Sequence, residues 1–182
     1  MASPDTSPSS INKIAWITGA SSGIGRAVAL RLADEGWQVA ASARSTDKLA
    51  ELEALRPGRI LSFPVDVTQQ DAVAATVAEI EDRMGPLDLA LFSAGSYKRD
   101  SATCFQGKDL AEVMTLNVIG TGYCLDAVIP KMVARRAGHI AVVASVVGYV
   151  GLPGGAFYGA NKASLINLCE GLYPELEKEA CA

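Results

Sequence analysis

The stretch Thr18-Gly19-Ala20-Ser21-Ser22-Gly23-Ile24-Gly25 decides the fold of this chain. Residues 13–17 precede it as an apolar run with the β-branched and aromatic bias of a buried parallel strand. Residues 26–34 follow it with the apolar spacing of an amphipathic helix. A strand that turns through glycines into a helix directs free backbone N–H groups and the positive end of the helix dipole at whatever lies in front. The stretch therefore predicts a pyrophosphate site, with a simple tight strand-to-helix turn as the alternative.

Length and composition indicate one soluble globular domain. The 182 residues suffice for a sizeable core, and the net charge of -4 gives no electrostatic reason to expect nucleic acid or an anionic membrane as a partner. Residues 1–12 are rich in Ser and Pro and are expected to form a disordered leader, with the domain spanning residues 13–182. The scattered cysteines predict reduced thiols in a cytoplasmic protein, with no disulfide framework and no metal site. These cysteines are Cys104, Cys124, Cys169 and Cys181.

Strand and helix patterns alternate along the rest of the chain. Strands are expected at residues 13–17, 37–43, 60–65, 87–92 and 139–144, and helices at 26–34, 46–55, 68–84, 109–136 and from 157 onward. Pro130 is expected to kink the fourth helix, and Pro174 to kink or shorten the last one. The alternation predicts an α/β fold, a parallel sheet with helices on both faces, without repeats or a second domain. The most apolar run, 140–152, is too short to span a membrane.

Small or polar residues follow each predicted strand, where ligands bind in such a sheet. Besides the glycine stretch, these positions are Arg44, Asp66-Val67, Ser93-Ala94-Gly95 and Ser145. They predict a cofactor groove along the carboxyl edge of the sheet.

Arg44 bears on the choice of cofactor. NAD-specific grooves usually place an acidic residue at the end of the second strand, but Ala43 occupies that place here and a cation follows it. Arg44 is suited to a ribose 2′-phosphate and so favours NADP(H) over NAD(H), unless it is only a solvated loop arginine. Asp47 is close by, but it falls in the first turn of the next helix, where an acid is expected in any case.

Tyr158 and Lys162 form the candidate reactive pair. Four residues apart on a helix, their side chains point the same way. An ammonium group beside a phenol favours the phenolate, so Tyr158 could exchange a proton with a carbonyl oxygen while Ser145 donates a hydrogen bond to it. The alternative is a pair of surface neighbours, but an apolar stripe along the same side of the helix weakens it.

These motifs, together with Asn117, resemble the short-chain dehydrogenase/reductase (SDR) family over nearly the whole chain. The resemblance implies a Rossmann-type doubly wound fold and a catalytic tetrad in which Tyr158 is the acid/base. Lys162 would hold the ribose and tune Tyr158, Ser145 would orient the carbonyl, and Asn117 would support a proton-relay water. The implied cofactor contacts are Thr18, Gly19, Ser21, Ser22, Gly23, Ile24, Gly25, Arg44, Asp66, Val67, Ser93, Ala94, Gly95, Tyr158 and Lys162.

The chain departs from the family pattern at two places that affect function. Ser93 replaces the usual Asn after the fourth strand, and the chain stops near the end of the last helix, so the sheet should lack the family's last strands. Two hypotheses follow. The first is an NADP(H)-dependent oxidoreductase acting on a small carbonyl compound or secondary alcohol; the alternative is a non-catalytic nucleotide-binding fragment or regulatory SDR-like protein. The resemblance also implies a homodimer or homotetramer built on helices 109–136 and 157–176.

Overall fold

A computed structural model describes residues 13–181 and contains one parallel sheet. The predicted disordered leader, residues 1–12, lies outside the described residues. The strand order is β3-β2-β1-β4-β5. β2 and β3 lie on one side of β1, and β4 and β5 lie on the other, so the strand order reverses between β1 and β4. Ligands bind at this kind of reversal in open α/β sheets. The strands are β1 (Ile14–Thr18), β2 (Gln38–Ser42), β3 (Ile60–Ser62), β4 (Leu89–Phe92) and β5 (His139–Val142).

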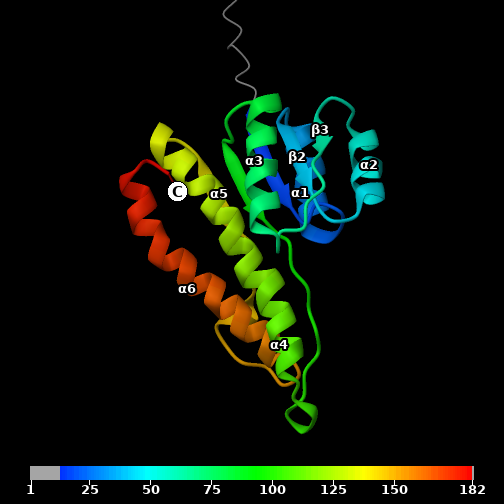
Figure 1. Ribbon diagram of the computed structural model, residues 1–182, viewed down its shortest axis with the longest axis vertical. Coiled ribbons are helices and arrows are strands. Elements are labelled where there is room, and N and C mark those ends of the chain that lie inside the picture. The colour runs from blue at the N-terminus through cyan, green and yellow to red at the C-terminus, as the bar shows by residue number, and fades with distance from the viewer. Residues whose placement is uncertain (1–12, 182) are drawn as a thin grey trace, which may run out of the picture.

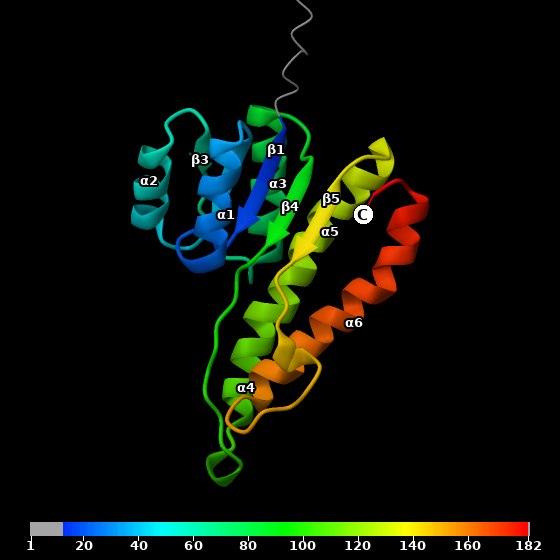
Figure 2. The same cartoon turned by 180° about the vertical axis from the view of Figure 1, so that it is seen from behind.

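Helices cover the sheet in two layers (Figures 1 and 2). Helices α1 and α2 lie on one face, and α3, α5 and α6 lie on the other. A π-helical segment, Thr115–Ile119, joins α4 to α5, and 3₁₀ turns occupy Ala102–Cys104 and Val146–Gly148. The helices are α1 (Gly23–Asp34), α2 (Thr46–Leu55), α3 (Gln70–Met84), α4 (Gly107–Met114), α5 (Gly120–Arg135) and α6 (Ala156–Lys178).

The alternation of side chains along β1 divides the core in two. Ile14 and Trp16 pack with α3 and α5, whereas Ile17 packs with α1 and α2. All five residues of β1 are buried. This makes β1 the centre of the molecule and fixes the position of the glycine stretch that follows it.

β5 is an edge of the described sheet. It pairs with β4, and in Figure 2 no helix lies in front of β4 and β5. His139 is exposed and the other residues of β5 are only partly buried. This agrees with the expectation of a sheet without the family's last strands.

Several predicted boundaries are corrected by the structure. The second, third, fourth and fifth strands are shorter than predicted. β3 ends at Ser62, although Phe63 N still donates to Ala41 O (2.9 Å) and Val65 N to Ala43 O (3.1 Å) in the segment around Pro64. The helix predicted from Thr68 begins at Gln70, because the N–H and hydroxyl of Thr68 both donate to Asp66 in a turn.

Neither proline ends its helix. α5 continues across Pro130, and a π-helical segment precedes it at Thr115–Ile119. α6 is not shortened at Pro174 and continues to Lys178.

The continuous helix Gly107–Arg135 is long and apolar enough, by length and composition, to cross a membrane. Its most apolar window has a mean hydropathy of 1.3. The same helix contributes Cys124, Leu125, Val128 and Met132 to the core on the sheet. Packing on the sheet therefore accounts for part of its apolar character, since 39% of that window is buried.

Candidate active site

Hydrogen bonds connect the loops that follow β1 and β4. The Thr18 hydroxyl accepts hydrogen bonds from the backbone N–H groups of Ser93 (3.2 Å) and Ala94 (3.3 Å). Gly19 has φ +69°, and a Cβ there would lie 2.8 Å from backbone atoms of both residues. A Cβ at Gly25 would lie 2.6 Å from the Gly19 carbonyl oxygen. Gly19 and Gly25 therefore permit close backbone packing.

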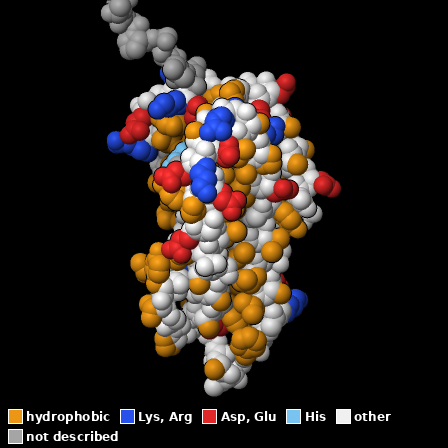
Figure 3. Space-filling view, turned by 90° about the vertical axis from the view of Figure 1, so that its left-hand side faces the viewer, with side chains coloured by type: hydrophobic (Ala, Val, Ile, Leu, Met, Phe, Trp, Pro, Cys, Tyr) orange, Lys and Arg blue, Asp and Glu red, His pale blue; other side chains and the backbone are white. Residues whose placement is uncertain are grey.

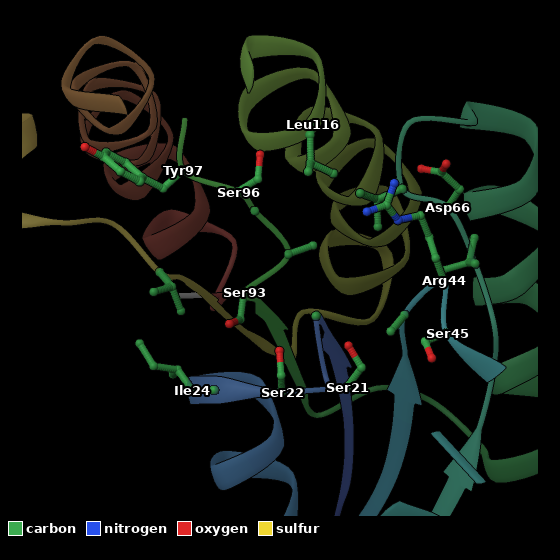
Figure 4. A pocket seen from close by; sticks show the side chains of 18 of the residues that line it. Ser21, Ser22, Ile24, Arg44, Ser45, Asp66, Ser93, Ser96, Tyr97 and Leu116 are labelled. Carbon is green, nitrogen blue, oxygen red and sulfur yellow. The ribbon is translucent and has the colours of Figure 1, made fainter. Parts of the chain in front are cut away.

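Gly23 has a different role. Its φ is +55°, and no atom of the described residues lies within 4 Å of the position a Cβ would take. Ser22 is the N-cap of α1, and within residues 13–181 its side chain makes no capping hydrogen bond. Figure 4 shows Ser21, Ser22 and Ile24 along this rim. The N-terminus of α1 thus opens onto the cavity with N–H groups available to an anion.

A cavity of about 500 Å³ runs along the carboxyl edge of the sheet in front of this terminus. Most residues predicted to bind a cofactor line it, and so do both members of the candidate reactive pair. These are Gly19, Ser21, Ser22, Gly23, Ile24, Arg44, Asp66, Val67, Ser93, Ala94, Gly95, Tyr158 and Lys162. Thr18, Gly25, Asn117 and Ser145 do not line it.

Arg44 and Asp66 lie at the end of the cavity formed by β2 and β3, where Figure 4 shows the Arg44 side chain near the Asp66 carboxyl group. Asp66 Oδ1 accepts hydrogen bonds from Thr68 N (3.0 Å) and Thr68 Oγ1 (2.8 Å). These bonds, with a smaller contribution from the positive charge of Arg44, hold the pKa of Asp66 below its usual range. Among residues 13–181, no carboxylate lies within ion-pair distance of Arg44. Its guanidinium is therefore available to an anionic ligand.

Tyr158 and Lys162 meet at the opposite end of the cavity. Lys162 Nζ lies 5.5 Å from the centroid of the Tyr158 ring and donates a 2.6 Å hydrogen bond to the carbonyl oxygen of Val143. Lys162 is only 5% exposed, and this burial lowers the pKa of its ammonium group. The pair thus has the proximity that acid–base chemistry at the phenol requires.

Asn117 lies behind the cavity wall, fully buried in the π-helical segment. Its Oδ1 accepts from Ser96 N (2.8 Å), and its Nδ2 donates to Ser96 O (2.9 Å) and to Asn161 Oδ1 (3.2 Å). The side chain therefore joins the loop after β4 to α6. Departures of this kind from α-helical hydrogen bonding are frequent at functional sites.

Ser145 begins the 3₁₀ turn Val146–Gly148, and its hydroxyl accepts a long hydrogen bond from Val147 N (3.5 Å). The structure thus brings Tyr158 and Lys162 into one cavity with the glycine stretch, with Asn117 behind the wall and Ser145 outside the lining.

The cavity also includes residues that the sequence analysis missed: Ala43, Ser45, Val65, Ser96, Tyr97, Leu116 and Val143. Ser96 and Tyr97 directly follow the predicted Ser93-Ala94-Gly95 contacts, so extending that segment could have found them. Asn161 was also missed. Its Nδ2 is buried and has no hydrogen-bond partner among residues 13–181, and only its position beside Lys162 could have drawn attention to it.

The described residues contain neither a metal-binding cluster nor a disulfide. Within residues 13–181, no group of three or more His, Cys, Asp or Glu side chains could hold a metal ion. All four cysteines are free: Cys104 is exposed, Cys169 is partly buried, and Cys124 and Cys181 are buried.

Comparison with known proteins identifies the family. The short chain dehydrogenase family model matches residues 13–181. The chain belongs to the short-chain dehydrogenase family of oxidoreductases. An uncharacterized oxidoreductase of Staphylococcus aureus is 33% identical over 168 residues, which are 92% of this chain and 73% of that protein. The 3-oxoacyl-[acyl-carrier-protein] reductase FabG of Staphylococcus epidermidis is 36% identical over 170 residues, 91% of this chain and 70% of that protein.

Solved structures of short-chain dehydrogenases share the fold. A short-chain dehydrogenase from Streptomyces avermitilis superimposes with a TM-score of 0.89 at 31% identity, over 93% of this chain and 62% of that chain. ElxO with NADP bound (26% identity, 94% and 71% covered) and NAD+-bound xylitol dehydrogenase (32%, 93% and 67%) give the same TM-score of 0.89. SDR relatives thus include both NADP-bound and NAD+-bound proteins, and this chain spans about two thirds of their length.

Proposed function

We propose that the protein is an NADP(H)-dependent oxidoreductase that transfers hydride between nicotinamide and a small carbonyl compound or secondary alcohol. One observation carries the proposal: Tyr158 and Lys162 line the same cavity as the N-terminus of α1 and Arg44. Arg44 has no ion-pair partner among residues 13–181. The glycine stretch leaves room for a pyrophosphate, and Arg44 is available for a 2′-phosphate, so the residues fit a dinucleotide. When bound, the nicotinamide supplies or accepts the hydride.

The proton is handled by the chain's own residues. In reduction, the Tyr158 hydroxyl donates a proton to the carbonyl oxygen, and in oxidation the phenolate takes it back from the alcohol. Lys162, whose Nζ donates to Val143 O, stabilises the phenolate and would hold the ribose of the bound cofactor. Ser145, just outside the cavity lining, would hydrogen-bond the same substrate oxygen, and Asn117, which joins the loop after β4 to α6, would support a proton-relay water.

The catalytic assignment is tested by Tyr158→Phe. This variant should lose hydride transfer by at least about a hundredfold while still binding NADPH, because only the exchangeable proton is removed. Tyr173→Phe, on the same helix and exposed, is the matched control and should turn over normally. Lys162→Ala should impair both binding and turnover. If wild type binds NADPH but reduces no member of a ketone and aldehyde panel, the alternative of a non-catalytic nucleotide-binding protein is correct.

The cofactor preference is tested by Arg44→Ala. Because a charge-assisted contact contributes about 1.5–3 kcal/mol, the variant should bind NADPH about ten- to a hundredfold more weakly and NADH about equally. Lys48→Ala removes an exposed cation from neighbouring α2 and serves as the control. Equal binding of both cofactors by wild type would leave Arg44 as a loop cation.

The setting of this activity is also part of the proposal. Net charge and free thiols support a cytoplasmic protein with a small-molecule substrate and with neither nucleic acid nor a membrane as partner. Exposed apolar side chains on the long helices, among them Ile119 and Tyr173, support a homodimer or homotetramer. Figure 3 shows hydrophobic side chains spread over the lower half of one side, whereas charges gather in the upper half.

A further inference from the structure

The segment Tyr97 to Asp100, in the long loop between β4 and α4, is bonded to the start of α6. The Tyr97 hydroxyl donates a 2.8 Å hydrogen bond to Gly154 O, and Asp100 N donates to the same oxygen at 3.4 Å. Asp100 Oδ2 accepts from Phe157 N at 2.8 Å, so a carboxylate lies at the positive end of α6. These contacts join parts of the chain 57 residues apart.

Tyr97 extends this attachment to Tyr158 itself. The two rings are 5.5 Å apart between centroids with an interplanar angle of 86°, the edge-to-face geometry that aromatic pairs favour. Figure 4 shows Tyr97 on the cavity wall above the glycine stretch. Tyr97 therefore lines the cavity, and its ring also contacts Tyr158, the phenol expected to exchange the proton.

The position of the Tyr158 ring matters because a proton donor must come within about 2.6–3.2 Å of the oxygen it serves. Tyr158 is only partly buried, so the core alone does not hold its ring. Tyr97 is itself anchored through its hydroxyl to Gly154, which makes it a fixed neighbour.

We propose that Tyr97 is a positioning residue that holds the Tyr158 ring in its reactive orientation. The inference rests on the proposed function, since it assigns Tyr97 a part in the same reaction. Two elements of Tyr97 contribute separately: its ring contacts Tyr158, and its hydroxyl fixes the ring through Gly154.

The chain contains a matched aromatic pair without a reactive member. Phe105 and Phe157 are 5.0 Å apart at 86°, and Phe157 directly precedes Tyr158 on α6. Phe105→Leu therefore removes an edge-to-face contact from the same turn of the helix without touching Tyr158. It separates an effect on helix stability from an effect on the phenol.

The experiment compares Tyr97→Leu, Tyr97→Phe and Phe105→Leu with wild type. Tyr97→Leu removes ring and hydroxyl, and kcat for carbonyl reduction should fall about tenfold with an unchanged NADPH Kd. Tyr97→Phe keeps the ring and should retain most of kcat, and Phe105→Leu should retain all of it. Both Tyr97 and Phe105 are more than half exposed, so all three variants should fold.

A second readout does not depend on turnover. In fluorotyrosine-labelled protein, the ¹⁹F resonance of Tyr158 is identified by its disappearance in Tyr158→Phe. Loss of the neighbouring ring in Tyr97→Leu should shift this resonance, whereas Tyr97→Phe and Phe105→Leu should leave it nearly in place. An active wild type whose kcat is indifferent to Tyr97→Leu overturns the inference alone, whatever the Tyr158 resonance does. A wild type that binds NADPH without turnover overturns the proposed function and, with it, the catalytic role of Tyr97.

Discussion

Alanine substitutions at Gly19 and Gly23 should separate folding from cofactor binding. Both glycines have positive φ, +69° and +55°, so alanine at either position adopts a conformation that L-residues disfavour. That strain costs about 1–2 kcal/mol, of which a more restricted unfolded chain offsets a few tenths to about 1 kcal/mol. The cost of backbone strain is therefore similar for the two variants. Their stabilities should differ because the added methyl group has different neighbours at the two positions.

At Gly19 the methyl group meets the backbone of the loop after β4. Contacts of 2.8 Å with Ser93 and Ala94 require the two loops to separate, and such overpacking costs about 1–3 kcal/mol more. Gly19→Ala should thus destabilise the protein by about 1–5 kcal/mol. At about 2–4 °C per kcal/mol for a chain of this size, Tm should fall by about 2–20 °C.

At Gly23 the methyl group meets no described atom within 4 Å and faces the cavity. Gly23→Ala should therefore lower Tm by at most about 7 °C, while NADPH affinity falls by about tenfold or more because the backbone N–H groups are screened from the phosphates. Gly58→Ala is the control. Gly58 has φ +72° and equally open surroundings but does not line the cavity, so its alanine variant should be destabilised alike and bind NADPH normally.

The assay is thermal unfolding followed by circular dichroism, together with an NADPH fluorescence titration of each variant below its Tm. If Gly19→Ala unfolds at the wild-type temperature, the close packing of the two loops is wrong. If Gly23→Ala binds NADPH as tightly as Gly58→Ala, the open N-terminus of α1 is not the phosphate site.

Three further predictions concern other parts of the molecule. The folded-state pKa of Asp66 is depressed, so its ionisation stabilises the fold above the unfolded-state pKa. This contribution is lost as the pH falls through the folded-state pKa. Thr68→Val removes one hydrogen bond to Asp66 and should raise its folded-state pKa, which an NMR titration measures. Burial raises the pKa of the Cys124 thiol to about 12, so at pH 8 a thiol reagent should modify exposed Cys104 first and Cys124 only after unfolding, with a reversed order of labelling contradicting the described burial. Sedimentation at micromolar concentration should show a homodimer or homotetramer, and a monomer would contradict the assignment of the long helices as an interface.

The sequence predicted those features that short stretches specify. The strand, glycines and helix around Gly23 form one local unit, and the spacing of Tyr158 and Lys162 sets their common direction once a helix is recognised. Strand lengths were overestimated because an apolar run continues beyond the residues that pair as a strand, as at Phe63 and Val65 after β3. The role of Tyr97 could not be predicted, because it depends on contacts with residues 57 and 61 positions later in the chain that no local pattern records.

The polar residues at the strand ends fall into two groups that the sequence cannot separate. Thr18 and Asn117 are buried, and hydrogen bonds within the chain use their polar atoms to connect the loops after β1 and β4 and helix α6. Arg44, by contrast, has no ion-pair partner among residues 13–181 and faces the cavity. A buried polar group whose bonds are satisfied internally stabilises an arrangement, whereas one left unpaired at a cavity retains its binding capacity for a ligand. Substitution of Thr18 or Asn117 should therefore act on cofactor binding through the geometry of the loops, and substitution of Arg44 through direct loss of a contact.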